Sequence, residues 1–164
     1  MNDEICIRRA TLKDLKALIK YRIDLFQEMG HINDLPTEKA FKKTLERYFT
    51  EAISKNEFIS WVAEFNSNII ASSGLVILKK PPTPKNPSGR EAYIMNMYTK
   101  PQWRRRGIAT MLLEEIFSFL QDIKIKKMSL HATEIGKGVY EKMGFQSLHI
   151  TEIEMIRQKD FLNC

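Results

Sequence analysis

Hydrophobic and polar positions in the first third of the chain predict a short strand followed by two amphipathic helices. Residues 5–9 have the composition of a strand. Thr11, with Asp14 three residues later, resembles a capping box and marks a helix start. Apolar positions then recur at helical spacing as far as Gly30, which is expected to end this helix. Pro36 lies at the start of a second pattern of the same kind.

The middle of the chain predicts three strands. Residues 58–65 and 69–78 are rich in apolar and β-branched positions, and the short polar link 66–68 between them predicts a hairpin. Residues 79–90 contain four prolines and are expected to form a loop. The next strand is predicted over residues 91–99.

The last part of the chain alternates helical and extended patterns. A long helix with a mostly apolar surface is predicted from near Arg105 to Asp122, and a strand follows over 127–132. A short helix is expected over 134–143. Residues 145–147 and 153–157 are predicted to supply the last extended segments.

This order of elements predicts a mixed α/β (α+β) domain around a central sheet, antiparallel in its first part. The sequence contains no internal repeat, low-complexity tract or linker between domains. We therefore expect residues 1–164 to form a single domain.

Composition excludes some classes of protein. No window of about 18 apolar residues could span a membrane, and the acidic N-terminus does not resemble a signal peptide. The two cysteines, Cys6 and Cys164, suggest neither a disulfide framework nor a metal site. We expect a cytoplasmic protein without a metal or a membrane partner.

The net charge of +6 raises the question of nucleic-acid binding. The basic residues are scattered along the chain, and a charge of this size is ordinary for a soluble domain. A nucleic-acid partner is therefore not expected.

Residues 101–110 carry the clearest chemical signal. They connect a predicted strand to a helix N-terminus, where free backbone N–H groups and the helix dipole favour an anion. Gly107 allows close approach of a ligand, and Arg104, Arg105 and Arg106 add positive charge. A phosphate-bearing ligand is expected. The glycine and lysine spacings of nucleoside-triphosphate and dinucleotide sites are absent.

Two motifs resemble the GNAT acetyltransferase superfamily. The first is Q/R-x-x-G-x-G/A, present as residues 104–109, and the second is the block from Tyr140 to Phe145 that contains Tyr-Glu-Lys-Met-Gly-Phe. Together they cover about residues 92–145. The resemblance implies a central, mixed, mostly antiparallel twisted sheet of six to seven strands flanked by about four helices.

The resemblance also implies acetyl-CoA as cosubstrate, a primary amine as acceptor, and transfer by direct attack in a ternary complex. Tyr140 would be the general acid that protonates the departing sulfur; its alternative role is to pack the short helix on the sheet. The implied cofactor-binding residues are Met97, Tyr98, Thr99, Arg104, Arg105, Arg106, Gly107, Ile108, Ala109, Thr110 and Tyr140.

A general base is harder to identify from the sequence. Glu91 is the only carboxylate on the strand face that we expect to contain residues 91, 93, 95, 97 and 99, with Asn96 on the opposite face. Glu91 is therefore a candidate base, although a solvated residue at a strand start is an equal interpretation. His131 is interpreted as a satisfied, partly buried histidine.

The acceptor has no readable signature. Four residues of the first helix either line the acceptor pocket or pack in the core, since their spacing fits both: Tyr21, Arg22, Phe26 and Met29. A non-catalytic acyl-CoA-binding regulatory module on the same fold is the alternative function. The sequence leaves a homodimer open.

Overall fold

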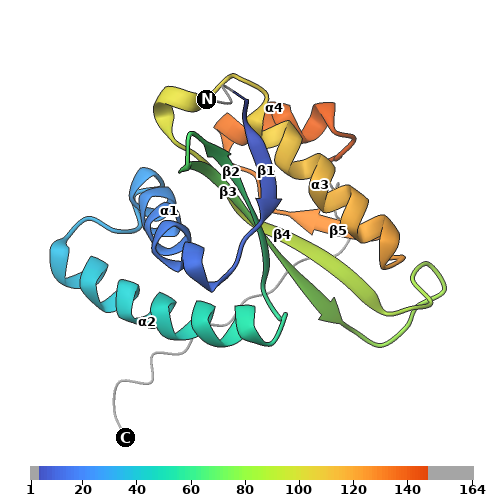
Figure 1. Cartoon of the computed structure of the whole chain (residues 1–164). Helices are drawn as coiled ribbons and strands as arrows, with labels where there is room; N and C mark the ends of the chain where they lie inside the picture. The colour runs from blue at the N-terminus through green and yellow to red at the C-terminus, as the bar shows by residue number, and fades with distance from the viewer. Residues whose placement is uncertain (1–3, 148–164) are drawn as a thin grey trace, which may run out of the picture.

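The structure is a computed structural model and describes residues 4–147. A five-stranded sheet with the strand order β1-β2-β3-β4-β5 lies at its centre (Figure 1). Neighbouring strands pair antiparallel from β1 to β4, whereas β4 and β5 are parallel. The strands are β1 (Cys6–Arg9), β2 (Ile59–Phe65), β3 (Asn68–Lys79), β4 (Arg90–Thr99) and β5 (Lys127–Leu130).

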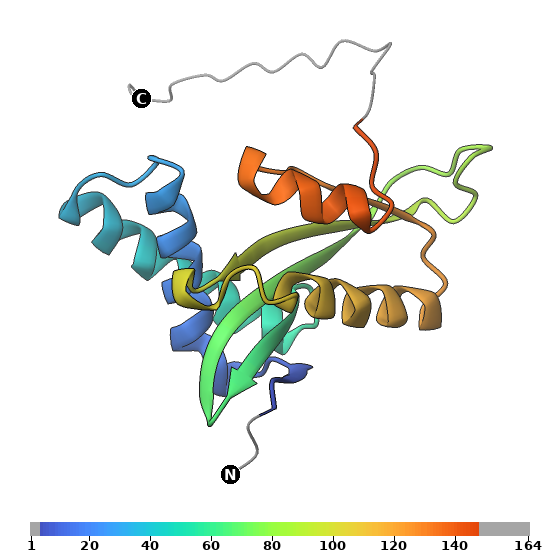
Figure 2. The same ribbon diagram turned by 90° about the horizontal axis from the view of Figure 1, so that it is seen from above.

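Two pairs of α-helices cover the two faces of the sheet. Helices α1 and α2 lie on one face and α3 and α4 on the other, as two perpendicular views show (Figures 1 and 2). The helices are η1 (Leu12–Asp14), α1 (Leu15–Glu28), α2 (Leu35–Ser54), η2 (Pro101–Trp103), α3 (Ile108–Asp122) and α4 (Glu134–Lys142). None of those in the described residues is long and apolar enough to cross a membrane.

Each face of the sheet has its own hydrophobic core. On the α3 side, Leu112, Leu113 and Ile116 are fully buried against residues of β2, β3 and β4. On the α1 and α2 side, Phe49 and Phe58 are buried in a separate cluster. Each such side chain contributes about 1.5–3 kcal/mol when fully buried. The sheet is therefore held from both sides, which fixes the strands that carry the site.

The predicted helix boundaries are confirmed at several positions. Thr11 and Asp14 form a capping box, in which Asp14 also accepts from the backbone N–H of Thr11 at 2.8 Å. Gly30 lies just beyond α1 with φ of +74°, a conformation that favours glycine. The cap of α2 is Asp34, whose carboxylate accepts from the N–H of Thr37.

A β-bulge interrupts β4 opposite β3. Ser72 pairs with Tyr98 and Gly74 with Met95, so two residues of β4 lie opposite one of β3. Asn96, in the bulge, has φ of +54°. Gly74 is required here, because a Cβ at this position would lie 2.5 Å from the ring of Phe58.

The fold class expected from the sequence is confirmed, with four α-helices around a mixed sheet. Two details differ. The helix predicted from near Arg105 begins at Ile108, because Arg105 and Gly107 adopt left-handed backbone conformations. Residues 145–147 are not in a strand, and the predicted segment 153–157 lies outside the described residues.

Candidate active site

The parallel strands β4 and β5 are paired along only part of their length. Their pairing runs from Glu91 and Lys127 to Ile94 and Leu130, where β5 ends. Strand β4 continues for five more residues, to Thr99, without β5 beside it. A cavity of about 400 Å³ opens where the pairing stops.

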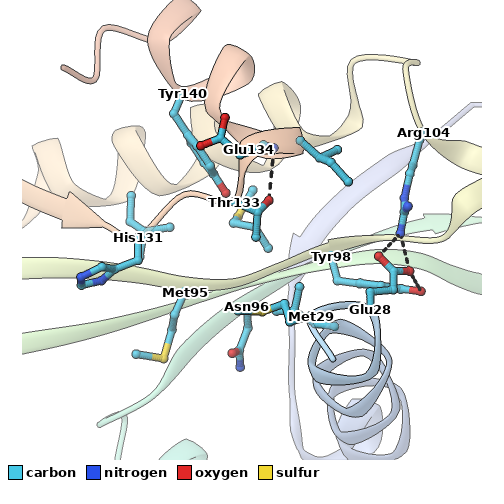
Figure 3. Close-up of a pocket in the computed structure, with 15 residues that line it drawn as sticks. Glu28, Met29, Met95, Asn96, Tyr98, Arg104, His131, Thr133, Glu134 and Tyr140 are labelled. Carbon is cyan, nitrogen blue, oxygen red and sulfur yellow. Dashed lines mark hydrogen bonds and ion pairs between the residues drawn. The ribbon is translucent and has the colours of Figure 1, made fainter. Parts of the chain in front are cut away.

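Three parts of the fold form the cavity walls (Figure 3). One wall is β4 from Ile94 to Tyr98, another is the end of α1, and the third is α4 with the residues before it. The side chains that the later argument uses are those of Glu28, Met29, Asn96, Arg104, His131, Glu134 and Tyr140.

The bulge in β4 changes which side chains face which helices. Met95 packs against the hydrophobic core between the sheet and helices α1 and α2, whereas Met97 packs against the core on the α3 side of the sheet. Asn96 faces α1, where its side-chain oxygen accepts a hydrogen bond from Arg22. The prediction that Met95 and Met97 share a face is therefore wrong, because a bulge shifts the two-residue alternation of a strand. Asn96 lies opposite Met97, as expected, but on the same side of the sheet as Met95.

The turn between β4 and α3 has the features of an anion site. Arg105 (φ +62°) and Gly107 (φ +77°) bend the backbone, and Gly107 occupies the N-cap position of α3. No side chain within residues 4–147 caps this helix, so its first N–H groups remain available for a ligand. A Cβ built on Gly107 would have no protein atom of the described residues within 4 Å, so the space over the turn is open.

The three arginines of the turn have different roles in the fold. Arg104 donates to both carboxylate oxygens of Glu28, at 2.7 and 2.8 Å, and to the backbone oxygen of Thr99 at 2.9 Å. It thus ties the turn to the end of α1 (Figure 3). The guanidinium of Arg106 lies 4.9 Å from the ring centre of Trp103. Arg105 is exposed.

Tyr140 projects from α4 toward the cavity (Figure 3). The hydroxyl of Thr133 caps α4 by accepting from the N–H of Gly136 at 3.2 Å. A Cβ at Gly136 would lie 3.2 Å from the Tyr140 ring, so a glycine lets the ring lie over this first turn. Burial raises the pKa of Tyr140 above its usual value, so the hydroxyl remains protonated at neutral pH.

Glu91, the candidate base from the sequence, does not line the cavity. Its carboxylate accepts from Lys127 at 2.6 Å and from Lys80 at 2.9 Å. These hydrogen bonds lower the pKa of Glu91, with the larger effect from Lys127. A carboxylate held by two ammonium groups at the paired end of the strands has the environment of a structural ion pair.

His131 follows directly after β5 and does line the cavity. Its Nδ1 atom lies 2.7 Å from the hydroxyl of Tyr93, which comes from β4. The side chain is exposed rather than partly buried, contrary to the prediction, because β5 ends one residue earlier and nothing in the described chain covers it.

Comparison with known proteins identifies the family. The pattern of the acetyltransferase (GNAT) family matches residues 26–145. The chain belongs to this family. The matched region contains the β4 strand, the turn and α4, so the resemblance expected from the two sequence motifs is confirmed.

Solved structures agree with this assignment. A predicted acetyltransferase from Clostridium acetobutylicum, determined with acetyl-CoA, is 33% identical with a TM-score of 0.83, over 93% of this chain and 96% of that one. A GCN5-related N-acetyltransferase from Ralstonia eutropha JMP134 is 26% identical with a TM-score of 0.81, over 93% and 99%. An aminoglycoside N-acetyltransferase in complex with CoA is 18% identical with a TM-score of 0.72, over 98% and 97%, and shows the fold alone. A search of curated proteins found no match.

Some residues of the cavity were not identified from the sequence. Glu28 reaches it from the end of α1, and Thr133 and Glu134 from the start of α4. Thr133 could have been recognised as an N-cap before a helical pattern. The position of Glu28 depends on how α1 packs against β4, for which the sequence carries no local signal.

Replacing Gly107 with alanine should weaken acetyl-CoA binding by more than about tenfold, because a Cβ would occupy the open space over the turn where a diphosphate would bind. The dissociation constant can be measured by calorimetry.

Gly144→Ala is the matched control. Gly144 also has a positive φ, of +90°, and open space around its Cβ position, but it lies after α4. Both variants should lose about 1–2 kcal/mol of stability from backbone strain. Equal acetyl-CoA affinity in the two variants would show that the turn is not the cofactor site.

Proposed function

We propose that this protein transfers the acetyl group of acetyl-CoA to a primary amine, by direct attack of the amine within a ternary complex. The single observation that supports this most strongly is the end of β4–β5 pairing at Ile94 and Leu130, next to the open turn before α3. Along the chain, the unpaired stretch of β4 is followed by the free N–H groups at the start of α3. This order fits a ligand in which an amide-bearing arm is joined to a diphosphate.

In this proposal the diphosphate binds the backbone N–H groups of residues 105–110. The pantetheine arm, which contains amide groups, pairs with the exposed edge of β4 at residues 97–99. The thioester then lies in the cavity close to Tyr140. Arg104 contributes mainly by holding the turn against Glu28, since its guanidinium is already engaged there.

The reaction makes one bond and breaks another. The neutral amine nitrogen attacks the thioester carbon, and the carbonyl oxygen becomes an oxyanion that a backbone N–H near Met97 or Tyr98 stabilises. When the C–S bond breaks, the thiolate takes its proton from the hydroxyl of Tyr140, whose burial supports a protonated state. The nitrogen loses its extra proton to a base, and exchange of protons with solvent then restores the Tyr140 hydroxyl and the free base, so that the net products are the amide and the thiol.

His131 is a better candidate for that base than Glu91. An imidazole can act as a general base, and His131 lines the cavity with its Nδ1 atom hydrogen-bonded to the hydroxyl of Tyr93. In the tautomer whose Nδ1–H donates to the Tyr93 oxygen, Nε2 carries no proton and can accept one from the amine, directly or through water. Glu91 is outside the cavity and is stabilised as a carboxylate by two lysines, which makes it a weak base.

Tyr140→Phe should lower kcat by about 10²-fold or more while the acetyl-CoA dissociation constant changes little, because the ring stays and only the proton donor is lost. The measurement is thiol release with a panel of amines. Unchanged kcat would remove Tyr140 from the acid role. If acetyl-CoA binds and no amine gives thiol release in the wild-type protein, the chain is instead a regulatory acyl-CoA-binding module.

The two base candidates give different pH profiles. His131→Gln should lower kcat/KM by about 10²-fold and change the shape of its pH profile, because the proposed base is lost. Glu91→Gln should leave the shape of the profile unchanged, with some loss of thermal stability from the broken ion pairs. An altered profile in Glu91→Gln together with a normal one in His131→Gln would reverse the assignment.

A further inference from the structure

A guanidinium lies on the α1 side of β4, next to the cavity. Arg22 of α1 is half-buried and donates to the side-chain oxygen of Asn96, which lines the cavity. Its guanidinium carbon also lies 4.8 Å from the centre of the Phe26 ring. The amide and the aromatic ring together hold the flat guanidinium in one orientation.

Arg22 differs in its partners from two other partly buried arginines. Arg8 pairs with Asp14 and Glu64, and Arg104 pairs with Glu28. Arg90 has no carboxylate partner among the described residues either, but it donates to the backbone oxygen of Ile123, away from the cavity. Within residues 4–147, no carboxylate lies within 4 Å of Arg22. A positive charge has therefore been moved partly out of water without an anionic partner in the described chain.

The electrostatic surroundings of Arg22 are consistent with this lack of a carboxylate partner. Burial is the dominant influence and lowers the pKa of Arg22, and the groups that oppose it are the phenols of Tyr48 and Tyr93 rather than carboxylates. Such a site costs free energy in the empty protein, and an anion bound there would offset that cost.

The remaining donors of Arg22 are not fully enclosed by the described residues. Only one guanidinium nitrogen donates to a protein atom in the described residues, and none of the fully enclosed side-chain nitrogen or oxygen atoms there lacks a partner. The other nitrogens of Arg22 must therefore reach solvent. A guanidinium with free neighbouring N–H groups matches the two oxygens of a carboxylate or phosphate.

We propose that Arg22 binds an oxyanion of the acceptor, so that the acceptor is a primary amine that also carries a carboxylate or a phosphate group. This inference rests on the proposed acetyl transfer. Asn96 connects Arg22 to the cavity in which the amine would react. It contacts Arg22, and together with His131 it lines that cavity. The oxyanion lies at Arg22 while the amine reaches the thioester.

The carboxylates at the cavity do not contradict this arrangement. Glu28 is already neutralised by Arg104. Glu134 belongs to α4, on the other side of β4 from Asn96 (Figure 3). Arg22, which contacts Asn96 on the α1 side of β4, therefore keeps its positive charge beside the cavity, and this suits an anionic acceptor better than a polycationic one.

The test compares matched pairs of amines. Amino acids are paired with their amides, and aminoalkyl phosphates with the corresponding amino alcohols, in thiol-release assays at saturating acetyl-CoA. The wild-type protein should prefer the charged member of at least one pair by about 10- to 100-fold in kcat/KM, mostly through a lower KM. This factor corresponds to the net free energy that a hydrogen bond to a charged group contributes. Which pair shows it distinguishes a carboxylate from a phosphate.

The variants assign this preference to Arg22. Arg22→Gln should lower kcat/KM far more for the charged member of each pair than for the neutral member, and Arg22→Lys should retain part of the preference because the charge remains without the fork. Lys16→Gln, which removes one exposed positive charge from the same helix, should leave the preference unchanged. Melting temperatures confirm that each variant is folded.

Each other outcome overturns the proposal. Equal rates for charged and neutral members in the wild-type protein would show that no oxyanion is recognised. An equal loss for both members in Arg22→Gln would show that Arg22 only positions Asn96. In both cases acetyl transfer itself stands. The absence of thiol release with every amine would overturn the proposed function as well.

Discussion

The early end of the pairing between β4 and β5 is the constraint on which the site depends. A parallel pair normally satisfies the backbone groups of both strands, but here β5 stops at Leu130 while β4 runs on to Thr99. The buried cores on both faces of the sheet hold β4 in place without this neighbour. The exposed strand edge is thus a rigid part of the fold that can accept a ligand as its missing partner.

The bulge at Asn96 gives β4 a change of side within one strand, and in the proposed reaction this would let it contact two ligands. Met95, before the bulge, packs toward α1 and α2, whereas Met97, after it, packs toward α3. Asn96 itself faces α1. Acetyl-CoA would approach from the α3 and α4 side, and the acceptor from the α1 side. The geometry is stabilised by Gly74, since any side chain there would displace the ring of Phe58, and by the tolerance of asparagine for positive φ.

The sequence predicted the features that have local causes. The capping box at Thr11, the hairpin after β2 and the glycine turn before α3 all follow from residue types at fixed spacing. The bulge was missed, although an asparagine inside an apolar strand opposite a glycine is a weak signal for one. The salt bridges of Glu91 and the environment of Arg22 depend on segments distant in sequence, so strand alternation alone could not reveal them.

Hydrogen exchange of backbone amides, with and without acetyl-CoA, tests the central claim that the β4 edge and the adjoining turn together bind the cosubstrate. The account predicts slower exchange in peptides that cover residues 95–99 and 105–110, and no change in β1 and β2, which lie at the far edge of the sheet. Slower exchange in residues 105–110 alone would show that the edge of β4 is not part of the acetyl-CoA site. Saturating acetyl-CoA that protects neither segment would contradict the account.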